Sequence, residues 1–352
     1  MKPNPLKGRG ADWNPQNRFE TLEYVRDEEA QLDFDEENDA PKTIYLRDPA
    51  RSIIATNDSP DVGFDASINP YRGCEHGCIY CYARPSHEYL GFSAGLDFET
   101  RILVKEEAPA LLRDELNAKK WEPKVLAISG VTDPYQPIER KLALTRGCLE
   151  VLAEFRNPVT VITKNHLVTR DADLYAELAR IDAAQVSLSI TTLDPELQRT
   201  MEPRTSSPQL RLDAIAKLSA AGIPVNVMVA PVIPGLTEHE MPAILKAARE
   251  AGAQNAGFVV LRLPFAVAPL FEQWLEDHFP DRKEKVLNRI RDLRGGKLYD
   301  AQWGVRGRGT GIFAEQIRAM FDVTCRRLGL NERDYDLSTA SFRKVTAQGT
   351  LF

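Results

Sequence analysis

The chain has 352 residues, 43% of them hydrophobic, with 45 lysines and arginines against 51 aspartates and glutamates and a formal net charge of −6. This balance argues against a generally basic nucleic-acid-binding surface, although a local basic face is compatible with it. Five cysteines, three of them clustered, do not indicate a disulfide framework. The apolar runs are far shorter than the roughly 20 residues of a membrane span, and the first residues lack the apolar core of a signal peptide. We therefore expect a cytoplasmic protein without membrane contact.

The N-terminal part of the chain is dominated by acidic residues. Residues 27–39 carry eight acidic side chains and no basic one. That density of like charge, with little apolar surface, does not favour a packed element. We therefore predict that residues 1–60 form an extended, partly disordered arm, within which residues 43–46 and 53–54 dock as short strands on the body.

From residue 61 onward, short apolar runs alternate with longer amphipathic runs, which is typical of βα units. Continuous apolar runs suit parallel strands that are buried on both faces. Six strands are expected, at residues 67–72, 124–129, 159–163, 186–190, 225–230 and 258–262. The helices between them are expected at residues 108–119, 142–155, 172–181, 209–220 and 238–251.

Six successive βα units are too few for a closed eight-stranded barrel. The sequence therefore predicts an α/β fold whose core, residues 61–265, is a partial (β/α)6 TIM barrel. Residues 266–352 are expected to add a helical C-terminal extension. In barrels of this kind the chemistry gathers at the carboxyl ends of the strands.

A cluster of three cysteines follows the first predicted strand. Cys74, Cys78 and Cys81 have the spacing C-x3-C-x2-C, and Tyr80 precedes the last of them. Three thiolates can hold a cubane [4Fe-4S] cluster and leave one iron open to a further ligand. The sequence therefore predicts that these cysteines are metal ligands and that the open iron serves chemistry.

An alternative is a zinc site in which His76 or His87 completes a Cys3His tetrahedron. Zinc sites usually come as paired knuckles, and no second C-x2-C occurs in this chain. The other cysteines, Cys148 and Cys325, stand alone and are expected to be small buried hydrophobic residues.

The spacing of the three cysteines, with an aromatic residue before the last, resembles the motif of the radical S-adenosylmethionine (SAM) superfamily. The resemblance implies a [4Fe-4S] cluster whose open iron binds the amino and carboxylate groups of SAM. It also implies reductive cleavage of SAM to a 5'-deoxyadenosyl radical that abstracts hydrogen from a substrate, with the protein supplying position and shielding. A cellular reductant such as flavodoxin or ferredoxin is then an expected partner.

The later strand ends supply candidates for a SAM pocket. Ser129, Thr132 and Asp133 lie in a polar turn after the second strand, where superfamily members bind the SAM amine. Lys164 at the rim of the third strand could pair with the SAM carboxylate. Ser189 on the fourth strand could serve the ribose or the carboxylate. Ordinary turn chemistry and solvation would account for the same residues.

Three further residues complete the predicted pocket. Tyr80 neighbours the cluster, and Arg204 could clamp a carboxylate with both guanidinium nitrogens. Gly235 lies in a segment that resembles the G-x-I-x-G-x-x-E element that contacts adenine in relatives, with Pro231 in place of its first glycine. Helix capping by Thr237 would also explain part of that segment.

Within the superfamily, the sequence most resembles spore photoproduct lyase and relatives that are called DNA-repair photolyases. In the lyase, a cysteine near the end of the second strand returns a hydrogen atom to the product radical, whereas this chain has Gly130 there. Tyr135 and Cys148 are therefore the candidate catalytic donors. The resemblance is carried by residues 69–73, 132–137 and 163–165.

A basic segment follows the core. Residues 282–308 hold nine lysines and arginines against three acids, with Tyr299 and Trp303 interleaved. Basic side chains, Arg306 and Arg308 among them, could track phosphates while the aromatic rings stack on bases. The alternative is a solvated amphipathic helix followed by a flexible loop.

Three functions thus compete. The first is a radical SAM enzyme that acts on an unidentified substrate, with nucleic acid as the first expectation and a peptide or a small metabolite next. The second is an iron–sulfur protein that binds nucleic acid or transfers electrons without SAM turnover. The third is a zinc-stabilised binding module.

Overall fold

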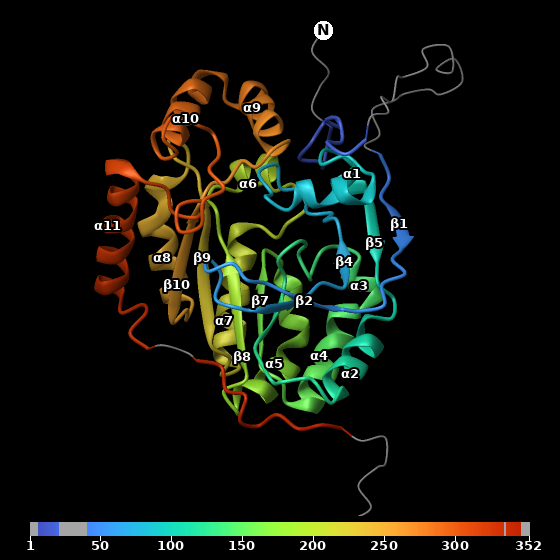
Figure 1. Cartoon of the computed structure of the whole chain (residues 1–352). Helices are drawn as coiled ribbons and strands as arrows, with labels where there is room; N and C mark the ends of the chain where they lie inside the picture. The colour runs from blue at the N-terminus through green and yellow to red at the C-terminus, as the bar shows by residue number, and fades with distance from the viewer. Residues whose placement is uncertain (1–5, 21–40, 334–335, 346–352) are drawn as a thin grey trace, which may run out of the picture.

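The computed structural model describes residues 6–20, 41–333 and 336–345. Its centre is a seven-stranded sheet in the order β10-β9-β8-β7-β6-β3-β2 (Figure 1). The strands are β2 (Ile54–Thr56), β3 (Ala66–Ile68), β6 (Leu126–Ile128), β7 (Val159–Thr163), β8 (Ala184–Ser189), β9 (Val225–Val232) and β10 (Asn255–Val260).

Six of these strands, β3 and β6 to β10, pair in parallel and follow one another in chain order. The seventh, β2, is antiparallel and lies at the edge beside β3. Many of their apolar side chains, including Val161, Val186 and Val227, have no exposed surface. The predicted partial (β/α)6 barrel is confirmed.

Helices lie between successive parallel strands, as the pattern predicts. Several begin with a proline in the first turn, where its missing N–H is not needed, and Asp194 and Ser207 cap two of them with side-chain oxygens. These helices are α2 (Ala108–Asn117), α3 (Glu139–Leu142), α4 (Leu144–Phe155), α5 (Ala172–Ala179), α6 (Pro195–Met201), α7 (Pro208–Ala220) and α8 (Met241–Glu250). Short 3-10 turns are η2 (Arg84–Leu90), η3 (His166–Asp171) and η4 (Glu238–Glu240).

The first predicted strand, residues 67–72, is divided in two. After β3 the chain turns at Asn69 and Pro70, and β4 (Tyr71–Arg72) joins a second sheet of order β1-β5-β4. That sheet contains β1 (Ile44–Arg47) and β5 (Arg101–Val104), and α1 (Asp97–Thr100) leads into it. A proline lacks the N–H that a continuous ladder needs, which explains the break.

The N-terminal arm is only partly described, and the acidic run 27–39 lies outside the described residues. The two short docking strands that we expected are present as β1 and β2. Residues 6–20 contain no helix or strand, yet they pack closely on the body. A Cβ atom on Gly10 would lie 1.7 Å from the carbonyl oxygen of Gly77, so only glycine fits at this contact.

The C-terminal extension is helical, as expected. It contains α9 (Val267–His278), α10 (Pro280–Asp292) and α11 (Gly311–Leu328). Figure 1 shows α9 and α10 together at one end of the sheet and α11 beside α8 at its outer edge. Among the described residues, no helix is both long and apolar enough to cross a membrane.

Candidate functional site

The cysteine loop follows β4 directly. Cys74 and Cys78 are buried and Cys81 is half-buried. Gly73 directly precedes Cys74 and Gly77 directly precedes Cys78, with φ angles of 78° and 65°, in the left-handed region that favours glycine. A side chain at Gly77 would meet a carboxylate oxygen of Glu99 at 2.6 Å. The backbone of the loop is therefore tightly held on both sides.

A fully buried arginine organises this loop. Arg84 donates to the carbonyl oxygens of Cys78 at 3.0 Å and of Gly77 at 3.2 Å. Its charge is balanced by Glu99 at 2.5 Å, and the same carboxylate accepts the backbone N–H of Ala11 at 2.8 Å. One buried ion pair thus fixes the cysteine loop and attaches the N-terminal segment to it.

The three thiols suit an iron–sulfur cluster in number and kind, because soft thiolates are its usual ligands. Burial raises the pKa of Cys78 well above its usual value and that of Cys81 to about 11. The thiols must therefore release protons when they bind metal. Within the described residues, no set of three or more His, Cys, Asp or Glu side chains is already arranged to hold a metal ion.

His76 links the cysteine loop to two strand ends. Its Nδ1 lies 3.3 Å from Asp133 Oδ2, and its Nε2 lies 3.1 Å from the side-chain nitrogen of Asn165. Burial opposes the charged form, but the carboxylate of Asp133 together with Cys74 prevails and raises the pKa of His76 to about 10. Asp133 also accepts the hydroxyl of Thr163 at 2.7 Å and the backbone N–H of Lys164 at 2.8 Å. Both ring nitrogens are thus engaged by the chain.

Glu202, at the C-terminal end of α6, is the centre of a buried polar network. Its carboxylate accepts hydrogen bonds from Tyr80, from Thr191 at 2.7 Å and from Arg211. The ammonium of Lys164 lies 3.7 Å away. Burial alone would raise the pKa of Glu202, but Arg211 and Lys164 lower it to about 2, so the group is ionised.

Lys164, a predicted SAM ligand, places its charged end in this network. Its ammonium donates to the carbonyl oxygen of Ala230 at 2.9 Å and lies 5.8 Å from the centre of the Tyr80 ring. Ser189 is buried nearby on β8, and its carbonyl oxygen accepts a hydrogen bond from Arg211 at 2.9 Å. The structure thus brings the ends of β7, β8 and β9 together around the aromatic residue of the cysteine motif.

The other predicted pocket residues contact the chain itself. Thr132 donates its hydroxyl to the carbonyl oxygen of Gly73 at 2.6 Å, which supports the start of the cysteine loop. The guanidinium of Arg204 lies 3.3 Å from the carboxylate of Glu75. The Ser129 hydroxyl lies 3.5 Å from the Thr132 carbonyl oxygen.

Gly235 has a φ of 83° in the turn after β9. A Cβ atom there would lie 3.4 Å from the backbone of Val286 on α10. The turn therefore packs against the C-terminal extension.

The two candidate hydrogen donors lie in the protein core. Tyr135 is fully buried, donates its hydroxyl to Asp171 at 3.1 Å and contacts the hydroxyl of Tyr175 at 3.0 Å. Cys148 is fully buried on α4, where burial raises its thiol pKa. Both side chains are therefore part of the packed core.

Two residues that our sequence reasoning passed over stand at the edge of the site. Tyr82 directly follows Cys81, is 49% exposed, and donates its hydroxyl to the carbonyl oxygen of Gly130 at 2.9 Å. The guanidinium carbon of Arg262, just beyond β10, lies 4.9 Å from the centre of the Tyr82 ring. The available signals were their positions in the sequence: Tyr82 follows the last cysteine, and Arg262 ends the sixth predicted strand.

The basic segment is less free than its sequence suggests. In the strap, by which we mean residues 299–309, Arg306 forms an ion pair with Asp61, and the N–H of Gly304 donates to the same carboxylate at 2.6 Å. A phosphate contact of Arg306, which stays a prediction, would therefore have to share or displace Asp61. Arg308 and Trp303 are exposed on the strap.

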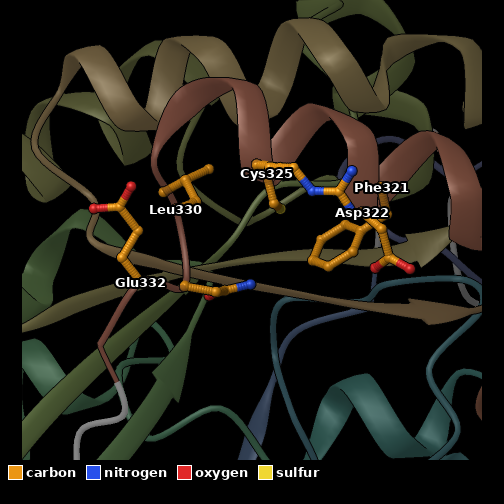
Figure 2. Close-up of a pocket in the computed structure, with 7 residues that line it drawn as sticks. Phe321, Asp322, Cys325, Leu330 and Glu332 are labelled. Atoms are coloured by element: carbon orange, nitrogen blue, oxygen red, sulfur yellow. The ribbon is translucent and has the colours of Figure 1, made fainter.

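A hollow of about 380 Å³ lies between α11 and the segment that follows it (Figure 2). Its lining includes Phe321, Cys325 and Leu330 but no residue of the cysteine loop or of the strand ends. Cys325 is buried in its wall, as expected of a small hydrophobic residue. This hollow is separate from the candidate site.

Comparison with known proteins identifies the family of this chain. The model of the radical SAM superfamily matches residues 68–248. An uncharacterised protein of Mycobacterium tuberculosis is 39% identical over 232 residues, which are 65% of this chain and 67% of that protein. An uncharacterised protein of Methanocaldococcus jannaschii is 29% identical over 222 residues, covering 63% and 79% of the two chains.

Among solved structures, spore photoproduct lyase complexed with dinucleoside spore photoproduct superimposes with a TM-score of 0.56. The identity is 18%, and the match covers 81% of this chain and 80% of the lyase. At that identity the likeness concerns the fold.

The fold and the cysteine loop define a class of enzyme whose reactive cofactor lies at the strand ends of a partial barrel. The chain belongs to the radical SAM superfamily, whose cofactors are a [4Fe-4S] cluster and SAM. This membership favours the iron–sulfur interpretation of the three cysteines over the zinc-site alternative.

Proposed function

We propose that this protein reductively cleaves SAM at a [4Fe-4S] cluster held by Cys74, Cys78 and Cys81 and uses the resulting radical to abstract hydrogen from a nucleic-acid or nucleotide substrate. The observation that carries the proposal is the three-thiol loop at the carboxyl ends of the parallel strands, held by the buried Arg84–Glu99 pair. When bound and reduced, the cluster supplies the electron that cleaves SAM to the 5'-deoxyadenosyl radical.

The chain's own residues position the reaction. Lys164 can meet the SAM carboxylate, because its ammonium is fixed by Ala230 and Glu202 at the rim of β7. To Ser189, on the next strand, we assign the ribose or the carboxylate of SAM. Thr132 and Asp133 act one step further back, since their polar atoms already hold the cysteine loop and the end of β7.

The remaining pocket residues are assigned by their places at the strand ends. Tyr80 presents its ring beside the Lys164 ammonium while its hydroxyl is fixed by Glu202. Ser129 and Gly235 belong to turns that border the pocket. Arg204 is half-buried and already paired with Glu75, so any contact with a carboxylate of SAM requires sharing that charge.

The nucleic-acid part of the proposal has two supports. One is the fold likeness to a lyase whose structure holds a dinucleoside. The other is the pairing of exposed aromatic and cationic groups near the cysteine loop, Tyr82 with Arg262 being the clearest case. Stacking on aromatic rings and contacts from cations to phosphates are the common means of binding single-stranded nucleic acid.

The test is anaerobic reconstitution with iron and sulfide, followed by incubation with SAM and dithionite. We expect four irons per chain, a charge-transfer absorbance typical of iron–sulfur clusters, and 5'-deoxyadenosine. A reconstituted cluster that yields no 5'-deoxyadenosine would instead favour an iron–sulfur protein without SAM turnover. A protein that binds zinc and no cluster would refute the proposal.

A further inference from the structure

Within the described residues Arg262 has no hydrogen-bond or ion-pair partner, unlike Arg84, Arg204 and Arg211 at the candidate site. Its Nε is buried without a hydrogen-bond partner, and within the described residues its guanidinium makes neither a hydrogen bond nor an ion pair. Nearby Arg294 also has a buried Nε without a partner, but its other two guanidinium nitrogens donate to the carbonyl oxygens of Val305 at 2.7 Å and Leu261 at 2.9 Å. An unpaired guanidinium next to apolar surface is costly, and an anionic ligand would remove that cost.

Arg262 lies at the same edge of the sheet as the cysteine loop. It follows β10 at the carboxyl end of the sheet, and its cation lies over the ring of Tyr82, one residue from Cys81. The strap is fixed beside it, because the N–H of Val260 donates to the carbonyl oxygen of Gly307 at 2.9 Å. The cation of Arg262 therefore lies between the cysteine loop and the strap.

The neighbouring charges leave Arg262 available. Asp61, an acidic group of that rim, is already paired with Arg306 and with the N–H of Gly304. Asp61 contributes an electrostatic attraction to Arg262 but no ion pair. A ligand would thus meet an uncompensated positive charge at this place.

Exposed aromatic rings belong to the segments around that charge. Tyr82, in contact with it, and Trp303, on the strap, are each about half exposed, at 49% and 51%. Phe265, three residues after Arg262, is 58% exposed and has a φ of 49°, which is unusual for a bulky residue. The Phe265 ring already carries the cation of Arg18 at 3.7 Å, so Tyr82 is the exposed ring in contact with Arg262. A guanidinium over one exposed aromatic ring matches a nucleotide, whose phosphate is anionic and whose base can stack.

We propose that Arg262 binds a phosphate of a nucleotide-containing substrate at the mouth of the barrel, beside Tyr82. This inference rests on the proposed function, since it names the residue and the chemical group by which that same site recognises its substrate. Bidentate hydrogen bonding to phosphate oxygens is the interaction for which guanidinium geometry is best suited.

The experiment compares two dinucleotides that differ in one charge. The cluster-loaded protein with SAM is titrated with dithymidine phosphodiester and with its uncharged methylphosphonate analogue. We expect the wild type to bind the charged dinucleotide about tenfold or more tightly, the range for hydrogen bonds to charged groups. Arg262→Gln should bring the two affinities close to each other, and Arg262→Lys should keep part of the preference.

Arg318→Gln is the matched control, because Arg318 is exposed on α11, away from the strand ends. It should keep the full preference. An unchanged preference in Arg262→Gln, or no preference in the wild type, would overturn the inference. Loss of SAM affinity in Arg262→Gln, with the dinucleotide preference intact, would assign this arginine to the cofactor instead and also overturn it.

Two further measurements separate the possible failures. Competition with inorganic phosphate identifies the source of the anion: equal affinity for phosphate and dinucleotide would contradict a nucleotide ligand. Formation of 5'-deoxyadenosine by the wild type without substrate tests the proposed function alone. If no 5'-deoxyadenosine forms but the Arg262-dependent preference is present, the proposed function fails and the phosphate site stands.

Discussion

The two sides of the barrel mouth differ in whether their charged side chains are paired. On the side of the cysteine loop, His76 faces Asp133, Glu202 faces Arg211, and Glu99 is paired with a buried arginine. On the side of β10, Arg262 has no such partner within the described residues. The first side is closed by its own contacts, whereas the second leaves a charge uncompensated.

We infer from this difference that the first side holds the cofactors and the second side binds the substrate. A fully partnered polar network is rigid, and rigidity is what a reactive cofactor needs from the residues around it. An unpaired cation with exposed aromatic neighbours gains its partner only when a ligand arrives. We therefore expect changes on the closed side to affect the fold and the cofactors, and changes on the open side to affect the ligand.

The largest expected effect concerns the cluster. Replacing Cys74, Cys78 or Cys81 with alanine removes one of three iron ligands, so SAM cleavage should be abolished. Iron content, visible absorbance and 5'-deoxyadenosine formation measure the outcome. Cys148→Ala and Cys325→Ala are the matched controls and should retain the cluster, because both residues are buried elsewhere. Equal loss of iron in all five variants would contradict the assignment.

The next effect tests the closed side directly. Glu202→Ala would leave the guanidinium of Arg211 buried without its carboxylate, since both side chains are at most 1% exposed. Breaking such a pair from one side costs about 3 to 5 kcal/mol of unfolding free energy. Urea unfolding, compared with wild type in the same cofactor state, measures it. Glu284→Ala, at an exposed position of α10, should change stability by less than about 0.5 kcal/mol.

The sequence was sufficient for the repeating part of the fold. Continuous apolar runs located all six parallel strands, and the cysteine spacing indicated the candidate site, because both depend on neighbours in the chain. The division of the first strand at Pro70 was visible in the sequence but was not used.

The charge pairing could not be predicted in this way. Glu202 was visible beside Arg204 in the sequence. Which of the two side chains joins the buried polar network depends on Tyr80, which lies 122 positions earlier in the chain. The ion pair of Arg306 with Asp61 likewise joins residues 245 positions apart. Such partners are set by tertiary packing, so the freedom of Arg262 and the engagement of Arg306 appear only in the folded chain.

A third prediction concerns SAM. Lys164→Ala removes the ammonium at the rim of β7 and should weaken SAM binding by about 1.5 to 3 kcal/mol, the range for hydrogen bonds to charged groups. Equilibrium dialysis of the cluster-loaded protein measures the affinity, and iron content should not change. Lys246→Ala, on the exposed face of α8, is the control and should bind SAM as the wild type does. Unaltered affinity in Lys164→Ala would show that this lysine contacts Glu202 and Ala230 but not SAM.

The smallest expected effect concerns the strap. If single-stranded DNA lies along it, Arg308→Gln should flatten the dependence of log affinity on log salt by about one unit, because one phosphate contact and its released counterions are lost. Arg306→Gln should flatten it by clearly less, since Asp61 already compensates that charge. The joint change of about two units that free side chains would give is therefore not expected.

Asp61→Asn tests this explanation from the other side. It frees Arg306, so binding should become tighter at low salt and its salt dependence should steepen toward that of one additional contact. Fluorescence anisotropy with a labelled oligonucleotide at several salt concentrations measures both slopes. The ion pair itself is near the surface and contributes at most about 1 kcal/mol to folding, so the variant should remain folded. Equal slopes for Arg306→Gln and Arg308→Gln would mean that DNA displaces Asp61 from Arg306. The strap and Arg262 would then belong to the same ligand-binding side of the barrel mouth.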